Sequence, residues 1–232
     1  MKALRKLAAA DQHLELVEVD DPKPEPGWVV VEVAYAGICG TDLHITHNSF
    51  PSWPPVTLGH EFYGRVGSVG AEVEGWSPGD RVVCEPHSLA CGRCHLCRRG
   101  HAELCARKRS PGWGIDGGMA ARVAVPAHLL HRVPVTVGDL AAALCEPTAI
   151  AVTAAERMPV EPGSTVVGTR VYSRDDLAVA TAMITGGVFD PDPLITRSAA
   201  LAEAPAAVED LRAGREVKVL VEGAPVGREG AR

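Results

Sequence analysis

The chain has 232 residues, of which 46% are hydrophobic, and a formal net charge of −6 at pH 7. This hydrophobic content is sufficient for a packed globular core. The acidic balance and the lack of a long basic run argue against nucleic acid as a partner. No window approaches the roughly 20 apolar residues of a membrane span, and residues 1–16 lack the apolar core of an export signal. We therefore expect a cytoplasmic protein with no membrane contact.

Alternating apolar residues predict that the first half is mostly β-structure. The pattern is clearest in WVVVEVAYA (28–36) and FYGRVGSVG (62–70). Shorter apolar runs follow in RVVCEP (81–86), ARVAVP (121–126) and HRVPV (131–135). Prolines and glycines between these runs favour a small irregular barrel. The glycines at 64, 67 and 70 lead into a turn and not into a helix, so we predict that they serve strand bends and not phosphate binding.

Helical patterns gather in the second half. Residues 139–158 are almost continuously apolar, and Pro147 is expected to interrupt or reset a helix there. Another helix is expected after Ser173, which can cap its start, and Gly186-Gly187 would end it. Residues 204–214 predict a further helix, and residues 215–223 predict a final strand.

Four of the seven cysteines form one short cluster, CGRCHLCRRGHAELC. Cys91, Cys94, Cys97 and Cys105 are separated by two, two and seven residues. At such spacings short loops let thiolates converge on one tetrahedral zinc ion. Four protein ligands leave no coordination position open, so we predict a structural zinc ion here.

Three further segments carry residues suited to a second, reactive metal. GICGTDLHI supplies Cys39, Thr41, Asp42 and His44; LGHEFYG supplies His60 and Glu61; LCEPTAIAV supplies Cys145 and Glu146. A thiolate, an imidazole and a carboxylate can hold zinc and leave a position open for an oxygen ligand. For Cys145 we expect only a packed thiol.

These motifs and the cysteine loop occur in the order found in zinc-containing medium-chain alcohol and polyol dehydrogenases. The sequence resembles that family over essentially its whole length. In the family, a GroES-like catalytic domain is joined to a Rossmann domain at a cleft that contains the catalytic zinc. The resemblance therefore implies a fold that is mainly β with α, a GroES-like irregular β-barrel with flanking helices.

The resemblance also assigns ligands. Cys39 and His60 match the zinc ligands that the family retains, and Glu61 matches an exchangeable neighbouring ligand. Glu146 matches either the third protein ligand or the residue that holds the zinc-bound water. The resemblance thus implies one catalytic and one structural zinc ion.

Other residues match supporting roles in the family. Thr41 and His44 correspond to a proton relay, and Asp42 would orient His60 from behind. The aromatic residues of this region stand apart from the matched motifs, and we expect them either to line a cleft or to pack in the core: Phe50, Trp53 and Trp113.

The chain departs from the family after Gly163. EPGSTVVG (161–168) predicts a strand that enters a dinucleotide fold, but it continues into TRVYSRDDLAVATAM with no G-x-G-x-x-G between them. Even one βαβ unit needs about 30 residues. We therefore expect the Rossmann domain to be largely deleted. The expected parts are a GroES-like zinc-binding catalytic domain (1–163), a remnant of the nucleotide-binding domain (164–187) and a C-terminal return to the catalytic domain (188–232).

Hydride transfer needs a carrier, because zinc cannot accept two electrons. We therefore expect zinc but no NAD(P), and a nonredox enzyme of the dehydratase, isomerase, epimerase or cyclase type. Zinc would act as a Lewis acid on an oxygenated small metabolite, with the catalytic residues Thr41, His44, Glu61 and Glu146. Two alternatives stay open. One is a zinc-dependent alcohol dehydrogenase whose nucleotide comes from a partner or was lost by truncation, and the other is a catalytically idle zinc-binding scaffold.

The loss of a partner domain would also leave apolar surface on the catalytic half. Exposed patches of that kind tend to find partners, so we expect a homodimer. TVVG (165–168) and the helix after Ser173 are the candidate contact segments.

Overall fold

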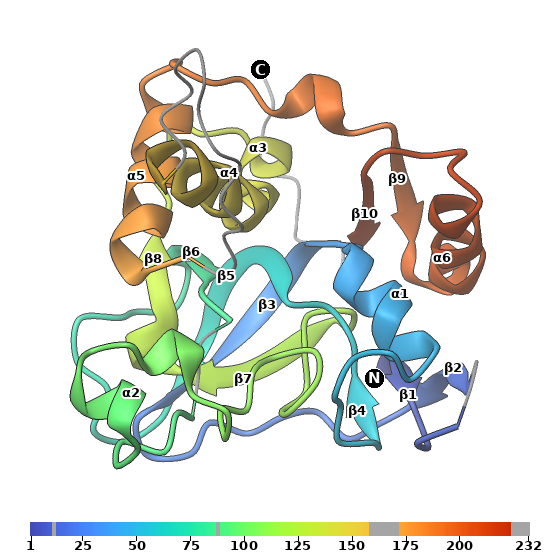
Figure 1. Ribbon diagram of the computed structural model, residues 1–232, viewed down its shortest axis with the longest axis horizontal. Helices are drawn as coiled ribbons and strands as arrows, with labels where there is room; N and C mark the ends of the chain where they lie inside the picture. Colours follow the sequence, from blue (N-terminus) through green and yellow to red (C-terminus); the bar gives the residue numbers. More distant parts are fainter. Residues whose placement is uncertain (11–12, 87–88, 158–171, 224–232) are drawn as a thin grey trace.

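The computed structural model describes residues 1–10, 13–86, 89–157 and 172–223 (Figure 1). The predicted strand EPGSTVVG, the expected boundary at 163/164 and the candidate contact segment TVVG lie outside these described residues. Among the described residues, no helix is long and apolar enough to cross a membrane.

A seven-stranded sheet forms the centre of the molecule. Its strands are β3 (Trp28–Gly37), β5 (Glu61–Val69), β6 (Arg81–Cys84), β7 (Arg122–Pro126), β8 (Leu130–Arg132), β9 (Arg197–Ala200) and β10 (Val219–Glu222). The order is β8-β6-β5-β3-β10-β9, and β7 pairs with β3. All pairs are antiparallel except β9 with β10, which is parallel. The two clearest sequence predictions, at 28–36 and 62–70, are confirmed by β3 and β5.

Alternation explains why β3 is central. Val29, Val31 and Val33 point to one face and are fully buried, as expected when every second residue of a strand faces the core. The predicted strand at 131–135 is shorter than expected, because Pro134 cannot donate a ladder hydrogen bond and β8 ends at Arg132.

A smaller three-stranded sheet lies beside the first, and the sequence patterns did not predict it. It consists of β1 (Lys2–Lys6), β2 (Leu14–Glu18) and β4 (Val56–Thr57) in the order β2-β1-β4. A single bridge between Ala3 and Ala120 joins β1 to the segment before β7. β1 and β2 were not predicted because they are short and rich in charged residues, so neither has a long alternating apolar pattern.

The glycines of β5 act as predicted. A Cβ atom at Gly64 would clash with the carbonyl oxygen of Glu32, and one at Gly70 would clash with that of Glu25. The register between β3 and β5 also shifts twice along the pair. These glycines therefore permit close approach of backbones at bulges, and no helix opens after them.

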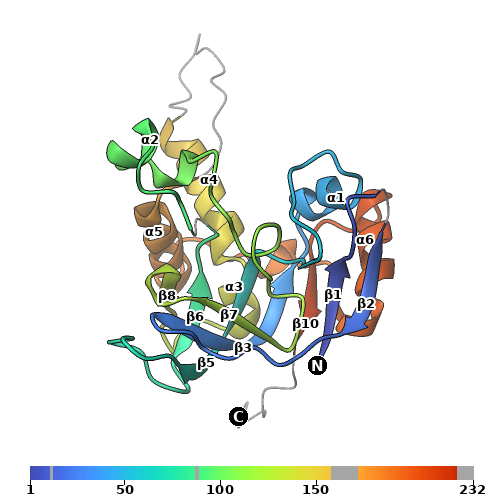
Figure 2. The same ribbon diagram turned by 90° about the horizontal axis from the view of Figure 1, so that it is seen from below.

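Helices cover the sheet in two groups. They are α1 (Gly40–Thr46), α2 (His95–Arg98), α3 (Asp139–Ala143), α4 (Cys145–Arg157), α5 (Arg174–Thr185) and α6 (Ala204–Arg212). Within the described residues, 3-10 turns accompany them at Ala102–Leu104, Ala127–Leu129, Asp192–Leu194 and Leu201–Glu203. Helices α3, α4 and α5 gather on one side of the molecule, and β9, β10 and α6 lie on the other (Figures 1 and 2). Helix α6 is in contact with β2.

The predicted helix reset near Pro147 is confirmed. The helical segment is divided into α3 and α4 at Leu144, so Pro147 falls in the first turn of α4, where its missing N–H costs nothing. The start of α5 is also as predicted: Ser173 Oγ accepts from the Asp176 amide, and the Asp176 carboxylate accepts from the Ser173 amide. Asp176 additionally accepts from Thr153 Oγ1 on α4 at 2.8 Å, which ties the two helices together.

The core consists of two apolar clusters. One fills the barrel between β3, β5, β7 and α6, and the other lies between the sheet and α3, α4 and α5. Residues of both clusters reach one cavity, with Trp113 from the first and Tyr172 from the second. The functional residues lie at this junction.

Candidate active site

The four clustered cysteines converge in the loop around α2. Their sulfur atoms all lie within 4.8 Å of one another. Sγ–Sγ distances are 3.9 Å for Cys91–Cys97, 3.4 Å for Cys94–Cys97 and 4.0 Å for Cys94–Cys105. A tetrahedral zinc site with Zn–S bonds of about 2.3 Å requires sulfur separations of about 3.8 Å. The cluster therefore has the dimensions of a four-thiolate zinc site.

The electrostatics of this loop also suit a cation. Backbone N–H groups of Arg93 and Cys94 lower the pKa of Cys91 to about 6, and Arg107 donates to its sulfur at 3.5 Å. By contrast, desolvation and the neighbouring thiols raise the pKa of Cys97 to about 12. The four thiols cannot all ionise together by themselves, and a divalent cation at their centre would supply the missing charge.

A second cluster joins the starts of two elements. Cys39 is the N-cap residue of α1, His60 directly precedes β5, and Glu61 is its first residue. One ligand atom from each lies within 4.8 Å of the other two. His60 and Glu61 are buried, with 4% and 1% of their surface exposed. The structure therefore brings together a thiol, an imidazole and a carboxylate that are at most 22 positions apart in the sequence.

Asp42 organises two members of this cluster. Its Oδ2 accepts from the Cys39 amide at 2.9 Å, and its Oδ1 lies 3.8 Å from Nδ1 of His60. Burial opposes the imidazolium form, but the Asp42 carboxylate and Cys39 raise the pKa of His60 well above its usual value. The site therefore favours positive charge, and a divalent metal ion would supply that charge in place of the proton on His60. The donor atoms and the negative electrostatic potential around them fit zinc.

Lys218 completes the cluster, and the sequence analysis missed it. This residue directly precedes β10, and its ammonium group donates to Glu61 Oε2 and, at 3.4 Å, to the carbonyl oxygen of Ile38. A Cβ atom at Gly37 would meet the Glu61 carboxylate and approach Lys218, so a larger residue there would displace the ion pair. One signal was visible: a single lysine interrupts the apolar run of the final strand.

Desolvation lowers the pKa of Lys218, but Glu61 more than offsets this, so the pKa lies above its ordinary value. Lys218 therefore carries its charge in a buried place. The ion pair with Lys218 holds the Glu61 carboxylate in position beside Cys39 and His60.

Glu146 lies on the cavity wall near the same cluster. It belongs to the first turn of α4 and is 6% exposed, but it is not among the three residues whose ligand atoms converge. Burial and then the Glu61 charge raise the pKa of Glu146 to about 7, and Tyr172 is hydrogen-bonded to it. The adjacent Cys145 is fully buried, as expected for a packed thiol.

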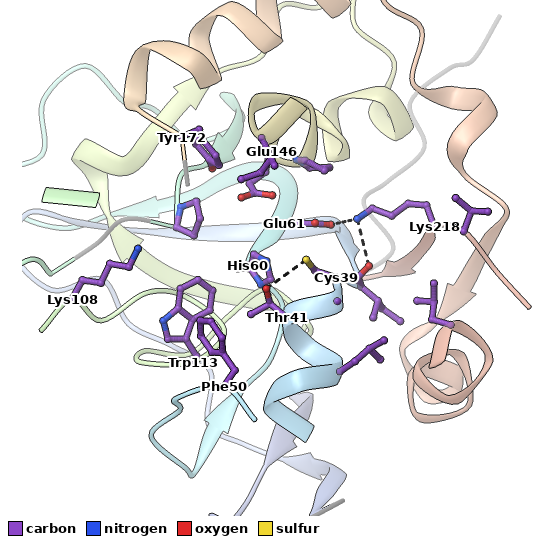
Figure 3. Close-up of a pocket in the computed structure, with 18 residues that line it drawn as sticks. Cys39, Thr41, Phe50, His60, Glu61, Lys108, Trp113, Glu146, Tyr172 and Lys218 are labelled. Atoms are coloured by element: carbon purple, nitrogen blue, oxygen red, sulfur yellow. Dashed lines mark hydrogen bonds and ion pairs between the residues drawn. The ribbon is translucent and has the colours of Figure 1, made fainter. Parts of the chain in front are cut away.

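The cluster opens into a cavity of about 540 Å³ (Figure 3). Its polar side chains come from the metal cluster, Thr41, Glu146, Tyr172 and two lysines, and the rest of its walls is largely apolar. The lining residues include Ile38, Cys39, Thr41, Leu43, Phe50, His60, Glu61, Pro86, Lys108, Trp113, Glu146, Pro147, Ile150, Tyr172, Leu211, Val217 and Lys218. This size and character are typical of sites for small molecules.

The predicted relay residues are placed differently. Thr41 lines the cavity, and its Oγ1 accepts from the Cys39 thiol at 3.8 Å. His44 is exposed one turn further along α1, with Nδ1 3.1 Å from Ser49 Oγ. Of the three aromatic residues, Phe50 and Trp113 line the cavity, whereas Trp53 is 41% exposed beneath the Arg109 guanidinium.

Comparison with known proteins agrees with this geometry. Residues 25–135 match the alcohol dehydrogenase GroES-like domain. The chain is 36% identical over 187 residues to a sorbitol dehydrogenase of Halalkalibacterium halodurans, covering 81% of this chain and 54% of that protein. It is 44% identical over 150 residues to an L-threonine 3-dehydrogenase of Streptomyces avermitilis, covering 61% and 42%. A protein described as a zinc-binding dehydrogenase of Sinorhizobium meliloti, solved with NADP, superposes with a TM-score of 0.81 at 24% identity, covering 95% of this chain and 98% of that one.

The fold and the two metal-ligand clusters define a zinc-binding GroES-like β-barrel with flanking helices, as the sequence predicted. The chain belongs to the family of zinc-containing medium-chain alcohol and polyol dehydrogenases. It spans about half the length of the curated relatives it matches. Because a structural neighbour binds NADP, our expectation that NAD(P) has no role lacks support.

Proposed function

We propose that this chain carries the zinc centre of an oxidoreductase that acts on a hydroxyl or carbonyl group of a small oxygenated molecule, such as a polyol or a hydroxy amino acid. One observation carries the proposal: the ligand atoms of Cys39, His60 and Glu61 lie within 4.8 Å of one another, at a cavity of about 540 Å³. The names of the curated relatives, sorbitol and L-threonine dehydrogenase, support the redox assignment.

The side chains suit this chemistry. Zinc, when bound, supplies Lewis acidity toward an alcohol or carbonyl oxygen. Thr41 lines the cavity beside Cys39 and would take the hydroxyl proton. His44 lies three residues further along α1 and is exposed, so it would pass that proton to solvent. Lys218 keeps the Glu61 carboxylate in place, and Glu146 offers a second carboxyl group on the cavity wall.

Hydride transfer also requires an acceptor. We propose that a nicotinamide nucleotide is supplied by a partner or by protein beyond this chain, because the strand pattern at 161–168 runs toward Ser173 without a glycine-rich phosphate loop. Residues 1–163 would then be the catalytic domain, 164–187 a remnant of the nucleotide domain and 188–232 the return to the catalytic domain.

The same missing loop favours a second candidate, the nonredox zinc enzyme. A bound zinc ion and two acidic side chains, Glu61 and Glu146, suffice for proton transfer and carbonyl polarisation without a hydride carrier. Dehydration, isomerisation, epimerisation and ring closure all belong to this class. An idle zinc scaffold is the third candidate.

One experiment separates the three candidates. The zinc content of the protein is measured first, and the protein is then incubated with sorbitol or L-threonine and NAD⁺ or NADP⁺. Nucleotide reduction is followed by the absorbance of NADH or NADPH. Reduction that disappears in Cys39→Ser and persists in Arg98→Met supports the oxidoreductase. Full zinc occupancy without reduction, but with substrate turnover detected by NMR, supports the nonredox enzyme. Zinc at the cysteine loop alone supports the scaffold.

Partner and location follow as further proposals. We propose a homodimer, supported by apolar side chains exposed on α4 and α5 at Ile150 and Val179. A cytoplasmic location is supported by the thiol ligands of both clusters, because a reducing compartment keeps thiols available for metal.

A further inference from the structure

The cysteine loop has a charge opposite to that of the whole chain. Between Cys91 and Arg109 there are six Lys or Arg residues and one acidic residue, Glu103, whereas the chain as a whole carries −6. Four zinc-bound thiolates would lower the local charge but leave it positive, because four negative charges are met by two on the ion. The loop is therefore a basic lobe on an acidic protein.

Most of this basic charge faces solvent, but Lys108 does not. Arg93, Arg98, Arg99 and Arg107 are exposed. Lys108 and Arg109 are both half-buried, but of the six only Lys108 lines the cavity. Figure 3 shows Lys108 on one side of the cavity and Lys218 on the other, with His60 and Cys39 between them. The metal cluster thus lies between two lysine side chains on opposite sides of the cavity.

The two lysines have different roles. Lys218 is ion-paired with Glu61 and serves the metal cluster. Lys108 lies away from that cluster, and the cysteine loop positions it. Its amide donates to the carbonyl oxygen of Cys105 at 3.1 Å, and its ammonium group donates to the carbonyl oxygen of Glu103 at 2.7 Å. The fold of the four-cysteine loop therefore sets the place of a cation at the cavity.

We propose that Lys108 binds an anionic group, phosphate or carboxylate, at the end of the substrate remote from the reacting oxygen. This inference rests on the proposed function, because it takes the cavity at Cys39 and His60 as the substrate site. A cavity of about 540 Å³ accommodates a phosphorylated polyol. The apolar walls formed by Phe50 and Trp113 lower the local dielectric and strengthen attraction between an ammonium group and an anion.

The position of Lys108 also selects between two sources of anion. If the anion is a phosphate of the substrate, it would bind Lys108 while the carbon chain of the substrate extends across the cavity to Cys39. If the anion is a phosphate of the nucleotide, the affinity for NAD⁺ would depend on Lys108. The substrate is the source that we propose, since Lys108 and the metal cluster share one cavity.

Binding is tested by titrating the zinc-loaded protein with sorbitol and with sorbitol 6-phosphate, following tryptophan fluorescence, to which Trp113 in the cavity wall contributes. We expect sorbitol 6-phosphate to bind about tenfold more tightly than sorbitol, the usual scale of one charge-assisted contact. Lys108→Met should remove most of this preference, and Lys108→Arg should restore part of it. Arg98→Met, which removes an exposed charge from the same lobe, should leave it unchanged.

Three outcomes overturn the inference: equal affinity for the two probes, an equal loss in Arg98→Met, or a Lys108→Met effect confined to NAD⁺ binding. Zinc content equal to that of the unmodified protein shows that the variants keep the cysteine loop intact. The proposed function fails separately. A phosphate preference together with substrate turnover that needs no nucleotide would disprove the oxidoreductase and keep the anion site. Nucleotide reduction without a phosphate preference would support the oxidoreductase and disprove the anion site.

Discussion

The two metal-ligand clusters of this molecule are built in opposite ways. The cysteine loop takes all four ligands from residues 91–105, and short turns alone bring their sulfurs together. The cluster at Cys39 takes ligands from the start of α1 and the start of β5, and its ion-pair partner Lys218 comes from the far end of the chain. A local site should depend on its metal for its fold, whereas the second site is held by the barrel around it.

The largest expected effect is a difference in how much each metal cluster contributes to the free energy of unfolding. Cys97→Ser should remove the loop zinc and lower the free energy of unfolding by about 4 kcal/mol or more, the scale of losing a structural metal. Cys39→Ser should lose the other zinc with a far smaller effect, since β3 and β5 remain packed. Urea unfolding with zinc analysis measures both, and equal destabilisation by the two variants would contradict the comparison.

The next effect concerns the buried ion pair. In the zinc-free protein, Lys218→Met should destabilise the fold by about 3 kcal/mol, because Glu61 is left charged and buried without a cationic partner. The double variant Lys218→Met with Glu61→Gln is the control and should recover most of the loss. Urea midpoints of the three proteins decide the matter. If the double variant is no more stable than Lys218→Met, the loss comes from packing and not from the charge.

Asp42 offers a smaller and more specific test. Asp42→Asn should weaken zinc binding at Cys39 and His60 by about 10- to 100-fold, the usual result of altering the partner of a ligating histidine. The amide cannot accept from the Cys39 amide and attract the His60 ring as the carboxylate does. Competition with a zinc chelator measures the affinity, and the cysteine-loop site in the same protein is the internal control, which should not change.

The smallest effect is a dependence on pH. The pKa of Glu146 is about 7 in the fold, above its ordinary value of 4.5. The folded protein therefore binds this proton more tightly than the unfolded chain, and the stability that Glu146 contributes is lost as pH rises from about 4.5 to 7.

This is best measured in the Cys39→Ser background, where the second zinc is absent. Adding Glu146→Gln should flatten the fall in urea midpoint between pH 5 and pH 7.5, because glutamine does not ionise. Two parallel pH profiles, with and without Glu146→Gln, would show that Glu146 titrates at its ordinary pKa.

Much of the architecture was readable in the sequence. β3 and β5 alternate apolar residues over nine or ten positions, and α5 begins with a complete capping box at Ser173. Such signals arise within a few residues, so they survive without knowledge of the fold. β1 and β2 were missed because charged residues interrupt their short apolar patterns, and β9 was missed because its pairing partner β10 lies about twenty residues further along the chain.

By itself the sequence predicted the four-thiolate cluster, and its resemblance to a known family offered Cys39, His60, Glu61 and Glu146 as candidate ligands of a second metal. For the cysteine loop, ligand chemistry and spacing suffice because the chain that joins the ligands is short. Only the tertiary structure decided that Lys218 pairs with Glu61, that Gly37 lies against this pair, and that Lys108 reaches the same cavity. These contacts join residues that are far apart along the chain, and only the packed sheet brings them together.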